Sequence, residues 1–167
     1  MDSVHRLLHA ARESLELSQS DVAKATGVST RTLHRMENDL GMVGFDILGK
    51  LRSYFESLGV TLISPADDQK WAMTFKLDLA PAPGPDVADK IYDPVPGRVL
   101  KAARILAGMT QAELASNSHV AHTTVRRIEK GDGKGSVEKV YVLQRFLEDR
   151  GVQFLKPQGE KGWSLRR

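Results

Sequence analysis

The sequence of 167 residues contains no cysteine. This absence excludes disulfide bonds, zinc sites built on thiolates and cysteine nucleophiles, and it agrees with a reducing compartment. No apolar run approaches the roughly 18 residues that a membrane-spanning helix needs. The first residues are not followed by the apolar core of a signal peptide either. We therefore expect a soluble, cytoplasmic protein.

The composition is that of a chain that can fold around a core. Hydrophobic residues make up 41% of the sequence and charged residues 27%, so the chain is not disordered by composition. Its length leaves room for one domain of medium size or for two small ones.

The net charge of +3 is unevenly distributed. Residues 1–75 carry 8 Lys and Arg against 10 Asp and Glu, and residues 76–97 carry 2 against 4. Residues 98–167 carry 14 against 7, which is a net charge of +7. A basic half beside a mildly acidic half indicates nucleic acid as a partner of the second half. Uneven surface charge without such a partner is the alternative.

An internal repeat relates the two halves with an offset of 92 residues. The segment 6–12, Arg-Leu-Leu-His-Ala-Ala-Arg, resembles the segment 98–104, Arg-Val-Leu-Lys-Ala-Ala-Arg. The offset continues without a gap to Trp71 and Trp163, and about a quarter of the aligned positions are identical. A repeat of this kind indicates two copies of one structural unit.

Copy one therefore comprises residues 1–75, copy two comprises residues 98–167, and residues 76–97 connect them. Five of the seven prolines lie in this connection. Because proline fixes the backbone and interrupts helices, we expect a semi-rigid and partly extended linker.

Each copy shows the pattern of four helices and a β-hairpin. Apolar residues recur at helical spacing over residues 4–15. Ser18 with Asp21, and Thr110 with Glu113, have the spacing of a capping box, which predicts the start of a second helix. Third helices are predicted to begin at about Ser29 and Ala121, and longer helices are predicted over 45–58 and 137–150. The predicted hairpins join 60–63 to 71–75 in copy one and 152–155 to 163–165 in copy two.

Two short helices joined by a tight turn, the first of them buried through a small alanine, are typical of a helix-turn-helix. The segment 17–37 contains Leu-Ser-Gln-Ser-Asp-Val-Ala, then Gly-Val-Ser and Met-Glu. It resembles the Cro/C1-type (XRE) helix-turn-helix family of phage and bacterial regulators, and the segment 109–131 is similar to that family more fully. The resemblance implies a mainly α fold, with two tandem lambda-repressor-like helix-turn-helix domains that each end in a short β-hairpin.

The same resemblance implies a sequence-specific double-stranded DNA-binding transcriptional regulator associated with the nucleoid. We expect a repressor of phage or mobile-element type with two reading heads. In that family, the residues matching Gln19 and Gln111 contact phosphate, and the third helix lies in the major groove. The exposed face of the third helix would comprise Ser29, Thr30, Arg31, Thr32 and Arg35 in copy one, and Ala121, His122, Thr123, Thr124, Arg126 and Arg127 in copy two.

Arginine can bond guanine through two N–H groups, so we expect base readout from Arg31 and from Arg126 or Arg127. The alternative is that these arginines bind only phosphate, which positions the protein without specifying a sequence. Lys130 and Lys134 lie just beyond the third helix and are expected to reach phosphate.

The two copies depart from the family pattern at different places. Copy two has His119 where copy one has Gly27, which strains the turn without excluding it. Copy one replaces the basic loop 130–135 by residues 38–44, which contain no basic residue. We therefore expect copy two to be the stronger DNA reader.

The resemblance further implies two internal ion pairs, Arg12 with Glu37 and Arg104 with Glu129. Matching positions in the family join the first helix to the end of the third helix. We expect both pairs to be structural.

No feature of the sequence points to catalysis or to a cofactor. There is no phosphate-binding loop, no serine–histidine motif and no carboxylate pair in a catalytic setting. His5 and His9 have the i,i+4 spacing of metal ligands, but without a third ligand we interpret them as a solvated helix face. The pair 67–68, Asp-Asp, is interpreted as a polar hairpin turn. We expect no enzyme, no cofactor and no metal site.

Two arrangements and two functions remain open. The two heads can form an intramolecular pseudo-dimer, or two chains can form a homodimer with four heads. The alternative function is a protein-interaction regulator, antiactivator-like or antitoxin-like, in which copy one binds a protein partner. Hairpin edges and Trp71 or Trp163 would supply that surface, unless both tryptophans cover their own cores.

Overall fold

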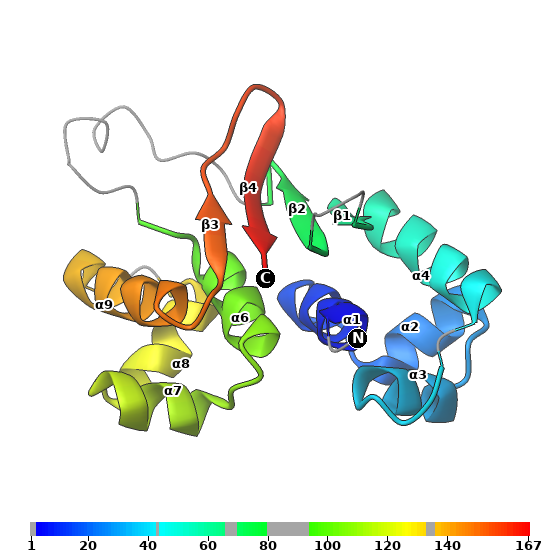
Figure 1. The fold of residues 1–167 in the computed structure, drawn as a ribbon, viewed down its shortest axis with the longest axis horizontal. Coiled ribbons are helices and arrows are strands. Elements are labelled where there is room, and N and C mark those ends of the chain that lie inside the picture. The colour runs from blue at the N-terminus through cyan, green and yellow to red at the C-terminus, as the bar shows by residue number, and fades with distance from the viewer. Residues whose placement is uncertain (1–2, 43, 66–69, 80–93, 133–135) are drawn as a thin grey trace.

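The computed structural model describes residues 3–42, 44–65, 70–79, 94–132 and 136–167. Each copy folds as four helices followed by two strands (Figure 1). Copy one contains α1 (Ser3–Ser14), α2 (Gln19–Thr26), α3 (Thr30–Glu37), α4 (Phe45–Ser57), β1 (Val60–Ile63) and β2 (Ala72–Lys76). Copy two contains α6 (Gly97–Leu106), α7 (Gln111–Ser118), α8 (His122–Lys130), α9 (Val137–Glu148), β3 (Gln153–Leu155) and β4 (Lys161–Arg166). The predicted mainly α fold, with strands ending each copy, is confirmed.

The second helix of each copy begins with the predicted capping box. The hydroxyl of Ser18 accepts from the backbone N–H of Asp21 (3.1 Å), and the Asp21 carboxylate accepts from the backbone N–H of Ser18 (2.9 Å). Thr110 and Glu113 repeat both bonds at 3.2 and 2.7 Å. These bonds satisfy amide groups that a helix start leaves without partners. Hydrogen bonds from Ser18 also lower the pKa of Asp21.

The turn of the helix-turn-helix has the left-handed backbone in both copies. Gly27 has φ of 73° and His119 has φ of 56°. Glycine adopts this region freely, whereas a side chain does so at a cost. The same conformation at a glycine and at a histidine means that the fold imposes the turn on the chain.

The two hairpins join into one antiparallel sheet in the order β1-β2-β4-β3. In the central pairing Met73 lies opposite Leu165, the residue 92 positions later. The hairpins also share a register, because Leu62 pairs with Met73 and Phe154 pairs with Leu165. A pseudo-twofold axis therefore passes between Met73 and Leu165.

Helices α1 and α6 lie side by side beneath the sheet, and α2, α3, α7 and α8 lie farther from it (Figure 1). Buried side chains of both copies form one hydrophobic cluster. The copies are thus joined by a shared sheet and a shared core as well as by the connecting segment. Of the predicted linker, residues 80–93 lie outside the described residues, as do residues 67–68 of the first hairpin.

The interpretation of His5 as a solvated residue is wrong, because its exposed fraction is 7%. Its Nδ1 is hydrogen-bonded to the carbonyl oxygen of Met36, and its Nε2 lies 2.8 Å from Oδ1 of Asp39. In copy two the equivalent residue is Gly97, where a Cβ would lie 1.9 Å from the carbonyl oxygen of Ile128. The first helix therefore approaches the end of the third helix in both copies. In copy one the contact is made by the His5 side chain, and in copy two it is made by the backbone at Gly97.

His9 is half-buried, and burial lowers its pKa although the Glu37 carboxylate opposes that effect. Among the described residues, no group of three His, Asp or Glu side chains is arranged to hold a metal ion.

A buried ion pair connects the first and third helices of each copy. Arg12 donates from Nε to Oε1 of Glu37 (2.6 Å) and from Nη2 to Oε2 (2.9 Å), and its Nη1 donates to the Leu17 carbonyl (2.7 Å). Burial alone would lower the pKa of Arg12, but the hydrogen bond and charge of Glu37 outweigh it and raise that pKa. Arg104 makes the same contacts with Glu129, at 2.6 and 3.0 Å. Each pair fixes the loop before the second helix as well as the third helix.

Two glycines lie in contrasting surroundings. Gly162 is in β4, where a Cβ would lie 2.7 Å from the carbonyl oxygen of Phe75 in β2. The absence of a side chain there allows β2 and β4 to approach beside the register shift between Thr74 and Lys76. Gly49 lies inside α4, and nothing surrounds the position of its Cβ. A glycine inside a helix costs about 1 kcal/mol relative to alanine.

We predict that Arg104→Ala lowers the free energy of unfolding by about 3 kcal/mol, because it leaves the buried Glu129 carboxylate without its charged partner. Chemical denaturation followed by circular dichroism measures the change. The control is Arg126→Ala, an exposed arginine whose loss should change stability by less than about 0.5 kcal/mol. Unchanged stability of Arg104→Ala with loss of DNA affinity would contradict the structural role.

We also predict opposite effects of alanine at the two glycines. Gly162→Ala forces β2 and β4 apart and should destabilise the fold by about 1–3 kcal/mol. Gly49→Ala meets open space and should stabilise it by up to about 1 kcal/mol. Urea denaturation of the two variants beside the original chain is the measurement. Equal effects at both positions would mean that the close approach of β2 and β4 at Gly162 is wrong.

Candidate nucleic-acid interface

The third helix of copy one presents a polar face to solvent. Thr30, Arg31 and Arg35 are exposed, while the opposite side of α3 is buried in the core. Ser29 and Thr32 are occupied in starting the helix, because the Ser29 hydroxyl accepts from the Thr32 backbone N–H (3.1 Å). Their hydroxyl groups also lie 2.8 Å apart. Of these residues, Thr30 and Arg31 are therefore the exposed ones whose side chains have no hydrogen-bond partner among the described residues.

The guanidinium of Arg35 is turned toward the following loop. Its Nε and Nη2 both donate to the carbonyl oxygen of Leu40, each at 3.2 Å. At the equivalent place in copy two, Arg127 has no such bond to any described residue. Arg127 is thus the freer of the two arginines.

The third helix of copy two presents a more basic face. Val125 and Ile128 are buried beneath it, and Ala121 begins the helix without a side-chain cap. On the face of α8 that is expected to meet DNA, Thr124 is half-buried. The exposed ones are Ala121, His122, Thr123, Arg126 and Arg127.

The glutamines that open the second helices have partners inside their own copy. Nε2 of Gln19 donates to Oε2 of Glu37 (2.9 Å), and Nε2 of Gln111 donates to Oε2 of Glu129 (2.7 Å). Both glutamines remain half-exposed. An amide nitrogen has two N–H donors, so one of them is left for an external acceptor. The ion pair thus orients the residue for which a phosphate contact is predicted.

The segments after the third helices differ in chemistry. In copy one, Leu40 is 54% exposed, Met42 100% and Phe45 92%. In copy two, Lys130 is exposed at the end of α8, while Lys134 lies outside the described residues. Copy one therefore offers apolar side chains where copy two offers a lysine.

Both third helices lie on the side of the molecule that faces away from the sheet, one on each side of the α1–α6 pair (Figure 1). The pseudo-twofold axis through the centre of the sheet relates them. Their separation follows from the β2–β4 pairing and from the packing of α1 on α6. Both third helices therefore face the same side of the molecule.

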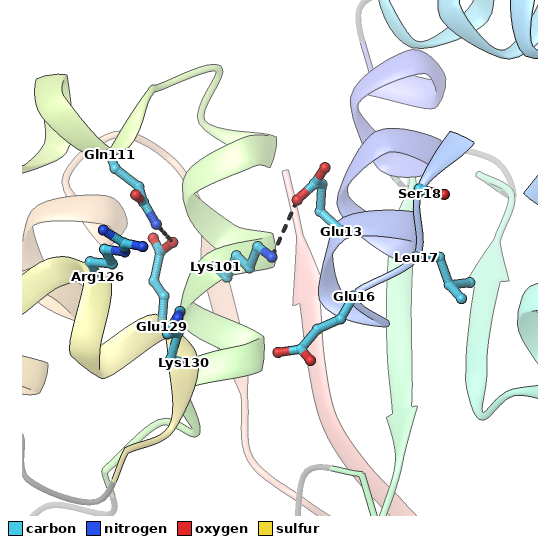
Figure 2. Close-up of a pocket in the computed structure, with 9 residues that line it drawn as sticks. All are labelled: Glu13, Glu16, Leu17, Ser18, Lys101, Gln111, Arg126, Glu129 and Lys130. Carbon is cyan, nitrogen blue, oxygen red and sulfur yellow. Dashed lines mark hydrogen bonds and ion pairs between the residues drawn. The ribbon is translucent and has the colours of Figure 1, made fainter. Parts of the chain in front are cut away.

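A charged cleft of about 360 Å³ separates the two helix-turn-helix units (Figure 2). Across it, Nζ of Lys101 lies 3.2 Å from Oε2 of Glu13. Figure 2 shows Glu16, also from copy one, pointing toward copy two, and Lys130 on the opposite wall. Burial alone would raise the pKa of Glu13, but Arg12 and Lys101 outweigh it and lower that pKa.

Sequence reasoning missed the Glu13–Lys101 contact, because nothing in the sequence shows that α1 packs beside α6. Glu13 lies in the last turn of α1, and Lys101 lies in the middle of α6.

Trp163 is 1% exposed and Trp71 is half-buried against the core. Trp163 is therefore unavailable as an interaction surface. Among the helices that the structure describes, none combines the length and apolar character that crossing a bilayer requires.

Comparison with known proteins gives one match. The sequence model of the helix-turn-helix family matches the chain twice, at residues 8–61 and at residues 100–149. No curated protein and no solved structure matches. The two matched segments contain the capping boxes, the turns and the third helices described above. The chain therefore belongs to the Cro/C1-type helix-turn-helix family of DNA-binding regulators and carries two tandem copies of its domain.

Proposed function

We propose that this chain is a sequence-specific repressor of phage or mobile-element type that binds double-stranded DNA as an intramolecular pseudo-dimer. The observation that supports it is the position of α3 and α8 on one side of the molecule, related by the pseudo-twofold axis of the sheet (Figure 1). Symmetric dimers of helix-turn-helix proteins bind half-sites about one helical turn apart. Here the shared sheet takes the place of the dimer interface.

The two heads should read unlike half-sites, because their exposed side chains differ at equivalent positions. Arg31 in α3 corresponds to Thr123 in α8, and His34 corresponds to Arg126. Arginine forms bidentate bonds with guanine, while threonine and histidine are shorter and less selective. Arg35 and Arg127 occupy equivalent positions, so the two helices differ in where the second arginine lies along the helix.

Copy two should contribute more affinity than copy one. The side chain of Arg127 has no hydrogen-bond partner among the described residues, whereas the side chain of Arg35 is held by the Leu40 carbonyl. Lys130 adds a phosphate contact, for which copy one has only Asn38. Gln19, Gln111 and Lys134 complete the proposed set of phosphate contacts.

A second candidate function is protein binding by copy one, as in an antiactivator or antitoxin. The exposed apolar side chains of Leu40, Met42 and Phe45 favour it, because apolar patches mark interaction sites. The two functions differ in salt dependence. Affinity for DNA falls steeply with salt as counterions are released, whereas an apolar protein contact does not follow that law.

We predict that removing arginines from α8 weakens DNA binding more than removing them from α3. Arg126→Ala with Arg127→Ala should cost at least about 2 kcal/mol, and Arg31→Ala with Arg35→Ala should cost about half of that. Fluorescence anisotropy on a selected duplex measures both double variants at one salt concentration. Equal losses would mean that the two copies contribute alike.

We further predict that selection from a randomised duplex pool with the full chain recovers two half-sites of different sequence about one helical turn apart. Repeating the selection with Arg126→Ala and Arg127→Ala should relax one half-site and leave the other unchanged. Recovery of two identical half-sites would contradict unlike reading. Failure to enrich any sequence at low salt would contradict DNA binding and favour the protein-binding function.

A further inference from the structure

The solvent side of α4 carries a projecting side chain and a recess one turn apart. Phe45, the first residue of the helix, is 92% exposed. Gly49 leaves open space where a Cβ would stand, and it lines a shallow groove between α4 and the end of α2. Residues four apart are neighbours on a helix surface. One helix face therefore holds a large aromatic ring beside an unfilled groove.

Copy two has neither feature. Tyr141 stands at the position equivalent to Gly49, and Val137 stands at the position equivalent to Phe45. Copy one thus keeps a glycine that weakens its helix, together with an aromatic ring exposed to water. Neither residue is explained by packing within the described part of the chain.

We propose that this face binds the same face of a second copy of the chain, with the two α4 helices antiparallel. In that arrangement Phe45 of each chain enters the groove over Gly49 of the other. A surface that carries both a projection and its matching recess is self-complementary, as a twofold-symmetric interface requires. The occupant is therefore another copy of this chain, because one patch supplies both halves of the fit.

The charges on this face support the same pairing. Asp46 and Lys50 lie one turn apart, both are exposed, and both line the groove. Among the described residues, neither has an ion-pair partner. Antiparallel pairing places Asp46 of one chain beside Lys50 of the other on both sides of the axis. Opposite charges in register favour this orientation over a parallel one.

The position of α4 leaves the proposed DNA surface uncovered. This helix forms the outer flank of copy one, at the end of the molecule away from α6 (Figure 1). Pairing through α4 would lengthen the assembly and join two pseudo-dimers, which gives four reading heads. The pairing itself does not depend on DNA binding, so it is tested without DNA.

Sedimentation equilibrium of the full chain over a range of concentrations tests the proposal. We expect a reversible dimer that Phe45→Glu and Gly49→Tyr each weaken at least about tenfold. Gly49→Tyr fills the recess with the residue that copy two has there. The matched control is Val137→Glu, which should leave association unchanged. A cooperative melting curve at a temperature no lower than that of the original chain confirms that each variant is folded.

Charge exchange supplies an independent measurement on the same surface. Asp46→Lys should weaken association, and adding Lys50→Asp to it should restore association, because the double variant is again self-complementary. A chain that remains monomeric up to about 1 mM overturns the proposal. A dimer that is insensitive to Phe45→Glu and Gly49→Tyr also overturns it. The affinity of the Phe45→Glu variant for duplex DNA is measured in a separate experiment. That experiment tests the proposed DNA-binding function and not this interface.

Discussion

The antiparallel pairing of β2 with β4 determines where every other element of the molecule lies. Met73 and Leu165 meet at the centre of the sheet, and the 92-residue offset relates them. The pairing covers the edges of β2 and β4 that each hairpin would expose alone, and unpaired edges invite association with other chains. It also brings α1 against α6, so two helix-turn-helix units share one core. The axis at the sheet centre then places both third helices on the opposite side (Figure 1).

Within each copy, the buried arginine–glutamate pair fixes the positions of the helices. It connects the first helix, the loop before the second helix and the end of the third helix, and it orients the glutamine that opens the second helix. These contacts are nearly identical in the two copies. Apart from the buried His5, which corresponds to Gly97, the differences described between the copies lie at the surface, in the third helices, in the segments that follow them and in α4. The two copies therefore share these interior contacts but differ in their exposed side chains.

Much of this architecture follows from local patterns in the sequence. Capping boxes and helical spacing depend on residues close together in the sequence, and the repeat gives each element twice, so they predicted the helices and strands to within a few positions. The joining of the two hairpins was not predicted, because neither strand shows which partner occupies its free edge. His5 was misjudged because its burial depends on Met36 and Asp39, which only the folded α1 and α3 bring to it. The cleft contact between Glu13 and Lys101 was missed for the same reason.

The difference between α3 and α8 has a consequence for any DNA that the chain binds. A regulator built from two identical subunits looks the same from both ends of its site, so it marks a position on the duplex but no direction. Here one end of the molecule presents Arg31 and the other presents Arg126 and Arg127, within a single covalent unit. The two ends of a complex of this chain with DNA therefore differ, and the complex has a defined direction along the duplex. A gene or a bound protein on one flank of the site therefore lies next to a different protein surface from a gene or protein on the opposite flank.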